Sequence, residues 1–542
     1  MSNRAEKKKG FRGGLLGTAA LVCGLAIAGL VLAACQPQVI EVEKEVVVTQ
    51  VVSEEVEVPV EVEKIVEVEV EVEVEVEKIV EVEVEVEKVV EKIVEVVVTP
   101  IPAQLPEGGV KTIPFMTTES DPESVAVFQE IIAEYEEDHS GIRIDLVLTA
   151  HGSEEERLIA ANAVGAELGV VGIHPEYLYD YVAAGYLLPL DEMVDGVGRD
   201  KFKLGAMLSL EGHDYAVGYA GGTHSTLWVR KDLFEEAGLD MPTNYDELLA
   251  TAEALTQDTD GDGDIDIYGI GIPAAANGAT RARFKSFVYQ NCGDWFDKEG
   301  NLVFDHPNVL EALNNYVALL EYAPPDVTGW SWFDGITAFT AGKIAMHPYG
   351  GRLGYNLFRD KPEMRENTTV IWYPVGNQVK AGRGGYDYMA VSANARWPEE
   401  TKDFLEFFFT GDRLARFEMT VPGHLIPPTS ELEEAIFGFD HPYVQQYGDD
   451  IRTLFESSRY NALPQLQMGA VDVETCTFDP AYNPMPWASE IIGQSISAQM
   501  IERVVVGGES PEDAWKWAYT EMQRIADEWK AEHPDWEPQA TQ

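Results

Sequence analysis

A two-letter stretch near the beginning limits the fold of this chain more than any other feature. From Val39 to Val98 the sequence is almost entirely alternating Val and Glu. Such alternation is typical of a β-strand with one apolar face, but a single strand of this length has no partner and its glutamates repel one another. We interpret residues 35–109 as an acidic low-complexity stalk, with a Val-lined coiled coil as the alternative. The folded part is therefore expected to span residues 110–542.

Residues 1–34 are predicted to be a lipoprotein signal peptide. A basic beginning ends at Arg12, an uncharged run follows from Leu15 to Leu32, and small residues precede Cys35. Leu32-Ala33-Ala34-Cys35 resembles a bacterial lipobox, at which the segment is removed and the Cys35 thiol is diacylated. The alternative is an uncleaved helix, since about 18 apolar residues just span a bilayer. Either interpretation places the rest of the chain outside the cytoplasm, on the outer face of the cell membrane or in a periplasm.

The charge balance excludes one large class of partners. The 542 residues include 39 Lys and Arg against 94 Asp and Glu, a formal charge of -55. Residues 101–542 alone carry 29 basic and 73 acidic side chains. A surface of this sign repels phosphate backbones, so we expect no nucleic-acid partner. The acidic body is predicted to suit neutral solutes or cations.

Strand-like and helix-like segments alternate after residue 110, which predicts an α/β protein. The first three are expected to be a strand, a helix and a strand over Lys111–Thr117, Pro122–Asp138 and Ile142–Leu148. Further on, Thr243-x-x-Asp246 resembles a capping box that would open another helix. These segments are interpreted as the scaffold of the body.

Several longer motifs keep a fixed order between about residues 110 and 530. They are Ala184–Leu190, Gly212–Val217, Leu227–Leu239, Pro242–Leu249, Ala338–Met346, Met389–Ser392 and Gly507–Ala514. As an ordered set they resemble the signature of the extracellular solute-binding proteins of ABC importers, the family 1 group that includes maltose-binding protein. The chain departs from that pattern at Leu168-Gly169-Val170, where the family usually has Pro-Asp-Val, and near Gly218, where a proline is usual.

The resemblance implies a two-lobed periplasmic-binding-protein-like α/β fold with a hinge and a ligand cleft between the lobes. One lobe would comprise about residues 110–215 and 383–430, the other 216–382 and 435–542. Such a protein captures a carbohydrate and delivers it to ABC permease subunits. It is expected to be a monomer, to need no cofactor and to catalyse no reaction. Two alternatives stay open, namely an exported glycoside-acting enzyme and a surface sensor or scaffold with the same fold.

Sugar recognition calls for flat aromatic faces beside polar side chains. All eleven Trp occur from Trp228 onward, and the loop Thr328–Asp334 holds three aromatic residues. The resemblance implies further candidate ligand contacts, at positions where the family of solute-binding proteins contacts its ligands. The predicted ligand-binding residues are Glu119, His174, Tyr177, Tyr219, Thr223, His224, Trp330, Trp332, Arg352, Tyr386 and Trp487.

Two further features concern metal and redox chemistry. Asp258, Asp260, Asp262 and Asp266 take ligand positions of an EF-hand loop, although Gly269 replaces the usual bidentate Glu. This pattern predicts a structural Ca²⁺ site, and an Asp/Gly-rich turn is the alternative. Cys292 and Cys476 are the pair left in an oxidising compartment once the signal is removed, which makes them a candidate disulfide.

Overall fold

The computed structural model describes residues 109–150, 153–373, 379–462, 468–479 and 485–538, all within one compact unit of the chain, residues 94–542. The predicted signal peptide, the lipidation site at Cys35 and the Val/Glu stretch lie outside the described residues. Within the described ranges, no helix is both long enough and apolar enough to cross a membrane.

Lobe 1 is built on a mixed sheet of seven strands. The strands are β1 (Lys111–Thr117), β2 (Ile142–Leu148), β3 (Val170–Ile173), β4 (Met207–Leu210), β5 (His213–Thr223), β9 (Gly382–Val391) and β10 (Asn461–Ala462). Their order is β2-β1-β3-β9-β5-β4, and β10 pairs with β9. β1 and β2 run parallel, in register from Lys111 opposite Ile142 to Thr117 opposite Leu148. β9 is antiparallel to β3 and β5 on either side of it.

Helices α2 (Pro122–Asp138), α13 (Pro398–Phe409) and α14 (Arg413–Glu418) pack together against one face of this sheet. Phe128 of α2 meets Phe115 of β1 with ring centroids 5.2 Å apart and Phe417 of α14 at 4.7 Å. Aromatic pairs at these distances add to the stability that apolar burial supplies. This core fixes the carboxyl end of β1, which leads directly to Glu119.

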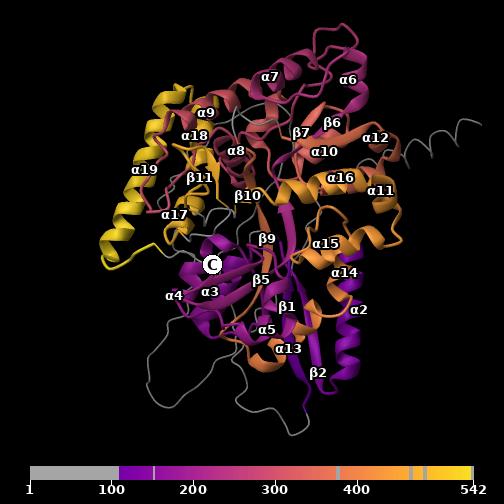
Figure 1. Ribbon diagram of the computed structural model, residues 1–542, viewed down its shortest axis with the longest axis vertical. Helices are drawn as coiled ribbons and strands as arrows, with labels where there is room; N and C mark the ends of the chain where they lie inside the picture. The colour runs from indigo at the N-terminus through magenta and orange to yellow at the C-terminus, as the bar shows by residue number, and fades with distance from the viewer. Residues whose placement is uncertain (1–108, 151–152, 374–378, 463–467, 480–484, 539–542) are drawn as a thin grey trace, which may run out of the picture. The chain divides into compact units, whose positions relative to one another are not determined.

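Lobe 2 contains a three-stranded antiparallel sheet in the order β7-β6-β8, with β6 (Thr226–Arg230), β7 (Met346–Pro348) and β8 (Thr368–Trp372). Its helices include α7 (Tyr245–Ala254), α8 (Gly278–Gln290), α9 (Pro307–Leu319), α18 (Ile496–Val505) and α19 (Pro511–Glu532). Figure 1 shows β1, β2 and β5 of lobe 1 in the lower half of the picture and β6 and β7 in the upper half. The two sheets therefore belong to separate lobes of one body.

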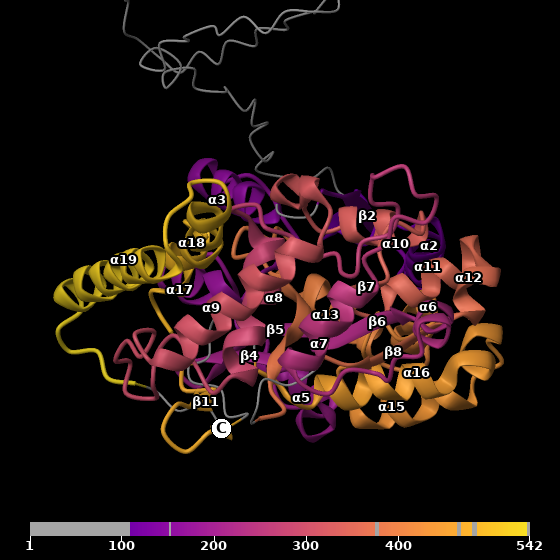
Figure 2. The same ribbon diagram turned by 90° about the horizontal axis from the view of Figure 1, so that it is seen from above.

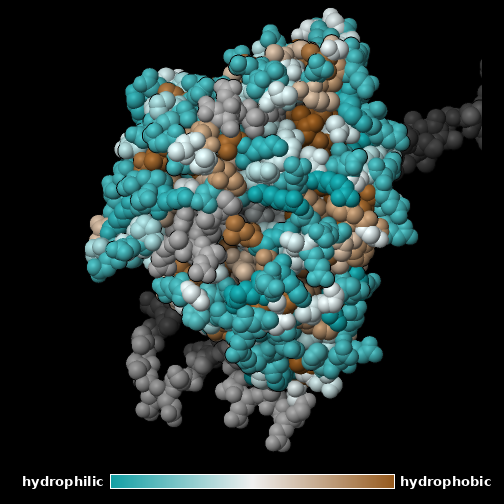
Figure 3. Space-filling model, in the orientation of Figure 1, coloured by the Kyte–Doolittle hydropathy of each residue, from teal (hydrophilic) through white to brown (hydrophobic). Residues whose placement is uncertain are grey.

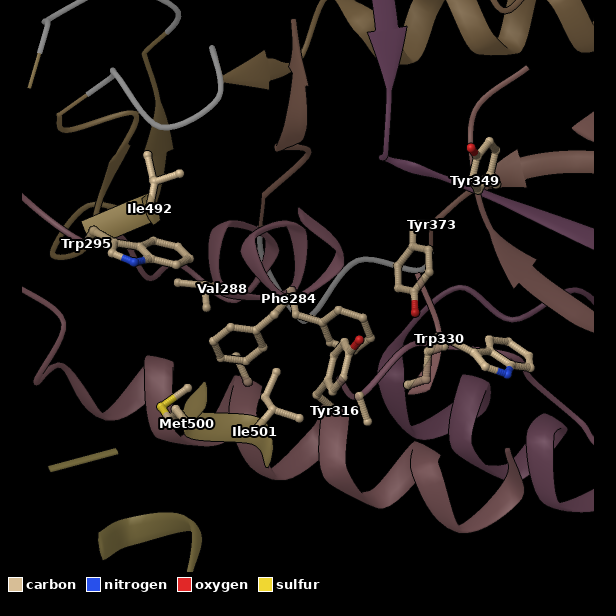
Figure 4. Packing of buried hydrophobic residues seen from close by; sticks show 14 of the residues in the cluster. Phe284, Val288, Trp295, Tyr316, Trp330, Tyr349, Tyr373, Ile492, Met500 and Ile501 are labelled. Carbon is tan, nitrogen blue, oxygen red and sulfur yellow. The ribbon is translucent and has the colours of Figure 1, made fainter. Parts of the chain in front are cut away.

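Helix α8 is the centre of the lobe 2 core. Phe284 on α8 contacts Tyr316 on α9, with 5.7 Å between ring centroids, and Figure 4 shows both rings beside Ile501 of α18. Nearly every residue of α8 is buried, including the basic side chains of Arg283 and Lys285, while Arg281 is partly exposed. α8 also packs against β9 of the other lobe, so its buried charges lie close to the lobe boundary.

A disulfide joins Cys292, just after α8, to Cys476 in the hairpin of β11 (Val471–Asp472) and β12 (Thr477–Phe478). The two cysteines are 184 positions apart in the chain. Cys292 and Cys476, the candidate disulfide from the sequence, are thus bonded to each other in the structure. This bond ties the hairpin to the core of lobe 2.

The remaining elements complete the two lobes and the path between them. They are α3 (Glu154–Val164), η2 (Pro175–Tyr177), α4 (Leu178–Ala183), α5 (Asp191–Val197), η3 (Arg199–Lys201), α6 (Lys231–Ala237), η4 (Leu320–Tyr322), η5 (Pro325–Gly329), α10 (Asp334–Thr340), α11 (Arg352–Asp360), α12 (Pro362–Glu366), α15 (Ser430–Ala435), η6 (Ile436–Gly438), α16 (Pro442–Ser458) and α17 (Ala488–Gly493). β5 leads into β6 through His224 and Ser225, and α16 packs on both β5 and β8. Figures 1 and 2 place α19 on the opposite side of the body from α11 and α16.

The predicted α/β two-lobed fold class is confirmed, and the first three elements have the predicted bounds. The predicted capping box is wrong by one position. Asn244, and not Thr243, is the N-cap of α7, because its side-chain oxygen accepts a hydrogen bond from the Glu247 backbone amide. Glu247 reaches back to the backbone amide of Thr243 at 2.8 Å. The Glu247 carboxylate thus accepts from the residue before the N-cap, so the contacts around Asn244 involve three residues and not the reciprocal pair of a capping box.

Candidate functional site

Charged side chains join the two lobes on one side of the lobe boundary. Arg352, the first residue of α11, forms ion pairs with Glu119 (3.2 Å from Nη2 to Oε2) and with Asp121, both of which follow β1. One turn further along α11, the Tyr355 hydroxyl donates to the Glu123 carboxylate at 2.8 Å. The side chain of Arg352 is only 12% exposed. These contacts hold the beginning of α11 against the beginning of α2.

A second set of contacts joins the lobes further along the same boundary. Arg281 of α8 lies 3.8 Å from the carboxylate of Glu176 in η2, and it also donates to the Ile492 carbonyl of α17 at 2.8 Å. Tyr179 of α4 meets Trp529 of α19 with 5.6 Å between ring centroids. Lobe 1 is therefore in contact with α8, α17 and α19 of lobe 2.

Basic and aromatic side chains gather between these two sets of contacts. The guanidinium of Arg283 lies 4.8 Å from the Trp332 ring centroid and 5.0 Å from that of Tyr349. Arg383 of β9 lies 5.9 Å from the Trp332 ring on the lobe 1 side. The His224 ring is 5.7 Å from Trp332. Stacking of guanidinium groups on aromatic faces holds these side chains in place.

We call this group the interlobe cluster and define it by its members from both lobes. They are Glu119, Glu176, His224, Arg281, Arg283, Trp332, Tyr349, Arg352, Arg383 and Asp387. Charged groups of both signs and two aromatic faces thus come together where the lobes meet. A polar molecule bound in this cluster would be surrounded by residues of both lobes.

Several polar atoms of the cluster are buried without a protein partner. Among the described residues, the Nε atoms of Arg281, Arg283 and Arg383 and the Nδ1 atom of His224 accept or donate no hydrogen bond to protein. Buried polar groups in folded proteins are almost always hydrogen-bonded. Several unsatisfied polar atoms in one region are therefore consistent with a site that binds a polar ligand.

Burial and neighbouring charges shift the ionisation of the acidic members. Burial raises the pKa of Glu119 to about 7, against the opposing effect of Arg352 and with a further rise caused by Asp387 and Asp121. Next to the cluster, burial disfavours charged His174, but its hydrogen bond to Glu155 and the nearby Glu176 outweigh burial and raise the His174 pKa to about 9.

The basic members of the cluster lie close enough to affect one another. Burial lowers the pKa of Arg383 to about 10, and the positive charges of Arg281 and Arg283 act in the same direction against Glu176. Burial, followed by Arg383 and Arg283, lowers the pKa of His224 well below its ordinary value, so this ring is neutral. Of the four guanidiniums, those of Arg281 and Arg352 have a carboxylate within 4.0 Å.

Six of the residues predicted from the sequence lie at or beside the cluster. Glu119, His224, Trp332 and Arg352 belong to it, and His174 and Tyr177 flank Glu176. Tyr219 is buried, with its hydroxyl 3.5 Å from that of Thr117 at the end of β1. Their roles as ligand contacts stay predictions.

Four predicted residues lie elsewhere. Trp330 is 5% exposed in the lobe 2 core (Figure 4), where its ring packs on Gly271, and Trp487 is 1% exposed and meets Trp529 and Trp536. Both are buried among side chains of lobe 2, and their roles as ligand contacts stay predictions. Thr223 bonds to Ser457 at 3.0 Å. Tyr386 lines a separate pocket of about 460 Å³ beside Gly221, Gly385, Glu433 and Arg459.

Three of the four arginines of the cluster, Arg281, Arg283 and Arg383, are not among the residues predicted from the sequence. Arg281 and Arg283 occur with Lys285 in the segment Thr280-Arg281-Ala282-Arg283-Phe284-Lys285 of an otherwise acidic body. Three basic residues at every second position within one short segment are the signal that could have identified them. Arg383, far away in the chain, carries no comparable local signal.

The aspartate loop between α7 and α8 brings three of its four predicted metal ligands together. Ligand atoms of Asp258, Asp260 and Asp262 all lie within 4.8 Å of one another on the surface. The carboxylate of Asp266 instead accepts hydrogen bonds from the backbone amide of Thr259 at 2.9 Å and from its hydroxyl. The Ca²⁺ site stays a prediction with three grouped carboxylates.

Two α/β lobes that meet across a buried cluster of polar and aromatic side chains define a binding protein for a small solute. Comparison with known families agrees, because the model of the bacterial extracellular solute-binding proteins matches residues 119–411. The chain belongs to this family. The predicted resemblance is thereby confirmed.

Individual relatives point the same way. The chain is 22% identical over 413 residues to YcjN of Escherichia coli (strain K12), which carries the name of an ABC transporter periplasmic-binding protein, covering 73% of this chain and 88% of YcjN. It is 26% identical over 308 residues to a mannitol-binding protein of Pseudomonas aeruginosa, covering 55% of this chain and 68% of that protein. The maltose-bound structure of T. maritima MalE3 has a TM-score of 0.63 at 16% identity, covering 77% of this chain and all of MalE3.

A structure of a Thermotoga lettingae ABC transporter solute-binding protein with bound alpha-D-tagatose has the same TM-score of 0.63, at 20% identity and 77% coverage of this chain. These relatives are binding proteins and not enzymes. The chain is accordingly a solute-binding protein, and the exported-enzyme alternative is set aside.

Proposed function

We propose that this protein captures a carbohydrate or polyol between its lobes and delivers it to the permease subunits of an ABC importer. The observation that carries the proposal is the interlobe cluster in a member of a solute-binding family. Relatives named for mannitol, maltose and tagatose support the solute class. The name of YcjN supports the link to an ABC transporter.

The side chains of the cluster suit a molecule with many hydroxyls. The half-buried ring of Trp332 offers a flat apolar surface for the C–H face of a sugar ring. Glu119 and Asp387 would accept hydrogen bonds from hydroxyls, and Arg281 and Arg283 would donate to ring or hydroxyl oxygens. Because these groups come from both lobes, a bound solute would stabilise the closed arrangement.

The lobes would turn about the segments that connect the two sheets. The proposed division is about 110–215 with 383–430 and 216–382 with 435–542, while the chain passes from β5 of the lobe 1 sheet to β6 at His224, and β10 in the second range pairs with β9 of that sheet. The pairing of β5 with β9 up to Thr223 extends the first lobe slightly along this crossing. No cofactor is part of the proposal, and the protein would act as a monomer.

The proposed location is the outer face of the cell membrane or a periplasm, with a lipid on Cys35 and residues 35–109 as a spacer. Replacing Cys35 with Ala should move the protein from the membrane fraction to the soluble fraction. An equal membrane content of C35A and the unchanged chain would contradict the lipid anchor. Unchanged solute uptake after deletion of the permease would favour a sensor or scaffold role instead.

Isothermal titration calorimetry of the full mature chain tests the binding proposal. The panel contains monosaccharides, oligosaccharides, polyols and the corresponding sugar acids, each added to protein freed of bound solute by partial unfolding and refolding. At least one compound should bind, and Trp332→Ala should weaken it. If folded protein gives no heat of binding with any compound of the panel, the proposed function is contradicted.

A further inference from the structure

Two arginines of the interlobe cluster have no carboxylate partner of their own. Arg352 is paired with Glu119 and Asp121, and Arg281 lies within 4.0 Å of Glu176. Among the described residues, neither Arg283 nor Arg383 has an acidic oxygen within this distance. Arg283 and Arg383 are therefore the guanidiniums of the cluster for which the described residues supply no ion pair.

Arg283 shows this most clearly, because it is only 2% exposed. One terminal nitrogen donates to the Ala279 carbonyl of its own helix at 3.3 Å, the side chain of Tyr349 is a further hydrogen-bond partner, and the guanidinium lies 4.8 Å from the Trp332 ring centroid. Its Nε atom has no hydrogen-bond partner in the protein. A buried charge without a counter-charge is strongly unfavourable, so an unpaired arginine at a binding site favours an anionic ligand.

The acidic groups nearby leave this charge largely unbalanced. Asp387 acts on Arg383 more weakly than Glu176 does, and Glu176 is already engaged by Arg281. Lys285, on the same helix, is balanced separately by the buried carboxyl of Asp294. The pair of Arg283 and Arg383 thus faces the lobe boundary from α8 on one side and from β9 on the other.

We propose that the ligand is an anionic carbohydrate, a sugar acid, whose acid group binds Arg283 and Arg383 while its ring lies against Trp332. This inference rests on the proposed function and specifies the class of solute. Guanidinium groups match the two oxygens of a carboxylate and bind them more strongly than neutral hydroxyls. The half-buried Trp332, whose ring centroid lies 4.8 Å from the Arg283 guanidinium and 5.9 Å from that of Arg383, is an aromatic ring near both groups against which the ring of a sugar acid would lie.

The strong negative charge of the body does not oppose such a ligand. The surface in Figure 3 is largely hydrophilic, and its exposed acids are screened beyond about 8 Å at physiological ionic strength. A buried guanidinium acts on a bound carboxylate at a few ångströms with little screening. The acidic surface therefore excludes anionic polymers, while the cluster accepts a small anion that enters between the lobes.

Calorimetric titration of matched pairs tests the inference on the full mature chain. The probes are D-galacturonate with D-galactose, D-glucuronate with D-glucose, and D-gluconate with D-mannitol. Within each of the first two pairs the compounds share ring and hydroxyls and differ mainly in the acid group. The acid of at least one pair should bind about tenfold or more tightly than its neutral partner, because hydrogen bonds to charged groups are the stronger kind.

Two variants of Arg283 and one control variant test whether this side chain causes the preference for the sugar acid over the neutral sugar. Arg283→Gln should remove the preference for the acid, and Arg283→Lys, which keeps the charge, should retain part of it. Arg359→Gln, which changes an exposed arginine paired with Asp360 on α11, should leave it unchanged. Thermal melts verify folding, and Arg383→Gln provides the same readout if the Arg283 variants do not fold.

The outcomes separate this inference from the proposed function. Tight binding of the neutral sugars with no preference for any acid would overturn the anionic ligand and leave the solute-binding role intact. Inorganic phosphate bound as tightly as the best sugar acid would overturn the carbohydrate part. If the folded protein binds none of the probes, both the anionic ligand and the proposed solute-binding function are contradicted.

Discussion

Glu119 provides a prediction that can be worked out from the structure. Its carboxyl group is buried at the lobe boundary beside Arg352, Asp121 and Asp387, and burial is the main reason that its pKa rises from 4.5 to about 7. The folded protein therefore holds the Glu119 proton more tightly than the unfolded chain does. The resulting stabilisation is complete below the unfolded pKa of 4.5 and is lost as the pH rises through about 7.

The size of the effect follows from the difference between the two pKa values. One pKa unit corresponds to ~1.4 kcal/mol, so between about pH 5 and about pH 8 the protein should lose roughly 2 to 3 kcal/mol through Glu119. Because the lobes can separate and hydrate the carboxylate, this figure is an upper limit. Glu119→Gln is isosteric with the protonated acid and should remove this pH dependence.

Denaturant unfolding of the full mature chain and of E119Q at both pH values measures the effect. The free energy of unfolding of E119Q, relative to the unchanged chain, should increase with pH by up to this upper limit. The exposed Glu137→Gln of α2 serves as the control and should show no such trend. A difference between E119Q and the unchanged chain that is constant with pH, or that decreases, would refute the argument.

Three further predictions concern other parts of the body. Reduction, or replacement of Cys292 and Cys476 by Ser, should lower the free energy of unfolding by about 2 to 4 kcal/mol in denaturant titrations, because the bond closes a long loop; an unchanged value would contradict this. Trp332→Ala should weaken solute binding about tenfold in calorimetry, while the neighbouring Phe333→Ala, 61% exposed, should not. Ca²⁺ added to EDTA-treated protein should raise the melting temperature, and Asp260→Asn should abolish the rise; equal melts with and without Ca²⁺ would count against the site.

Local signals were enough to predict the beginning of the fold. The Asp121-Pro122 boundary and the alternation of β2 predicted the bounds of β1, α2 and β2 correctly, because turn residues and periodicity act over a few positions. The shifted cap at Asn244 shows the limit of such signals. Two overlapping sequence patterns differ by one residue, and only the backbone geometry selects between them.

The site depended on contacts that no local pattern contains. Trp330 and Trp332 are two positions apart, yet Trp330 packs on Gly271 in the core while Trp332 stacks against Arg283. Whether each tryptophan enters the core depends on which residues of distant segments pack against it. Arg383 joins the cluster only because β9 crosses beside α8. Sequence patterns therefore identified the class of protein and part of its cluster, but not the sign of the charge at its centre.

A crystal structure of the full mature chain with the sugar acid that binds most tightly would test the central claim most directly. The ligand should lie between the lobes, with its ring on Trp332 and its carboxylate on Arg283 and Arg383. The lobe contacts from Arg352 to Glu119 should be retained. A ligand bound elsewhere, or one that touches residues of only one lobe, would contradict solute capture by the interlobe cluster.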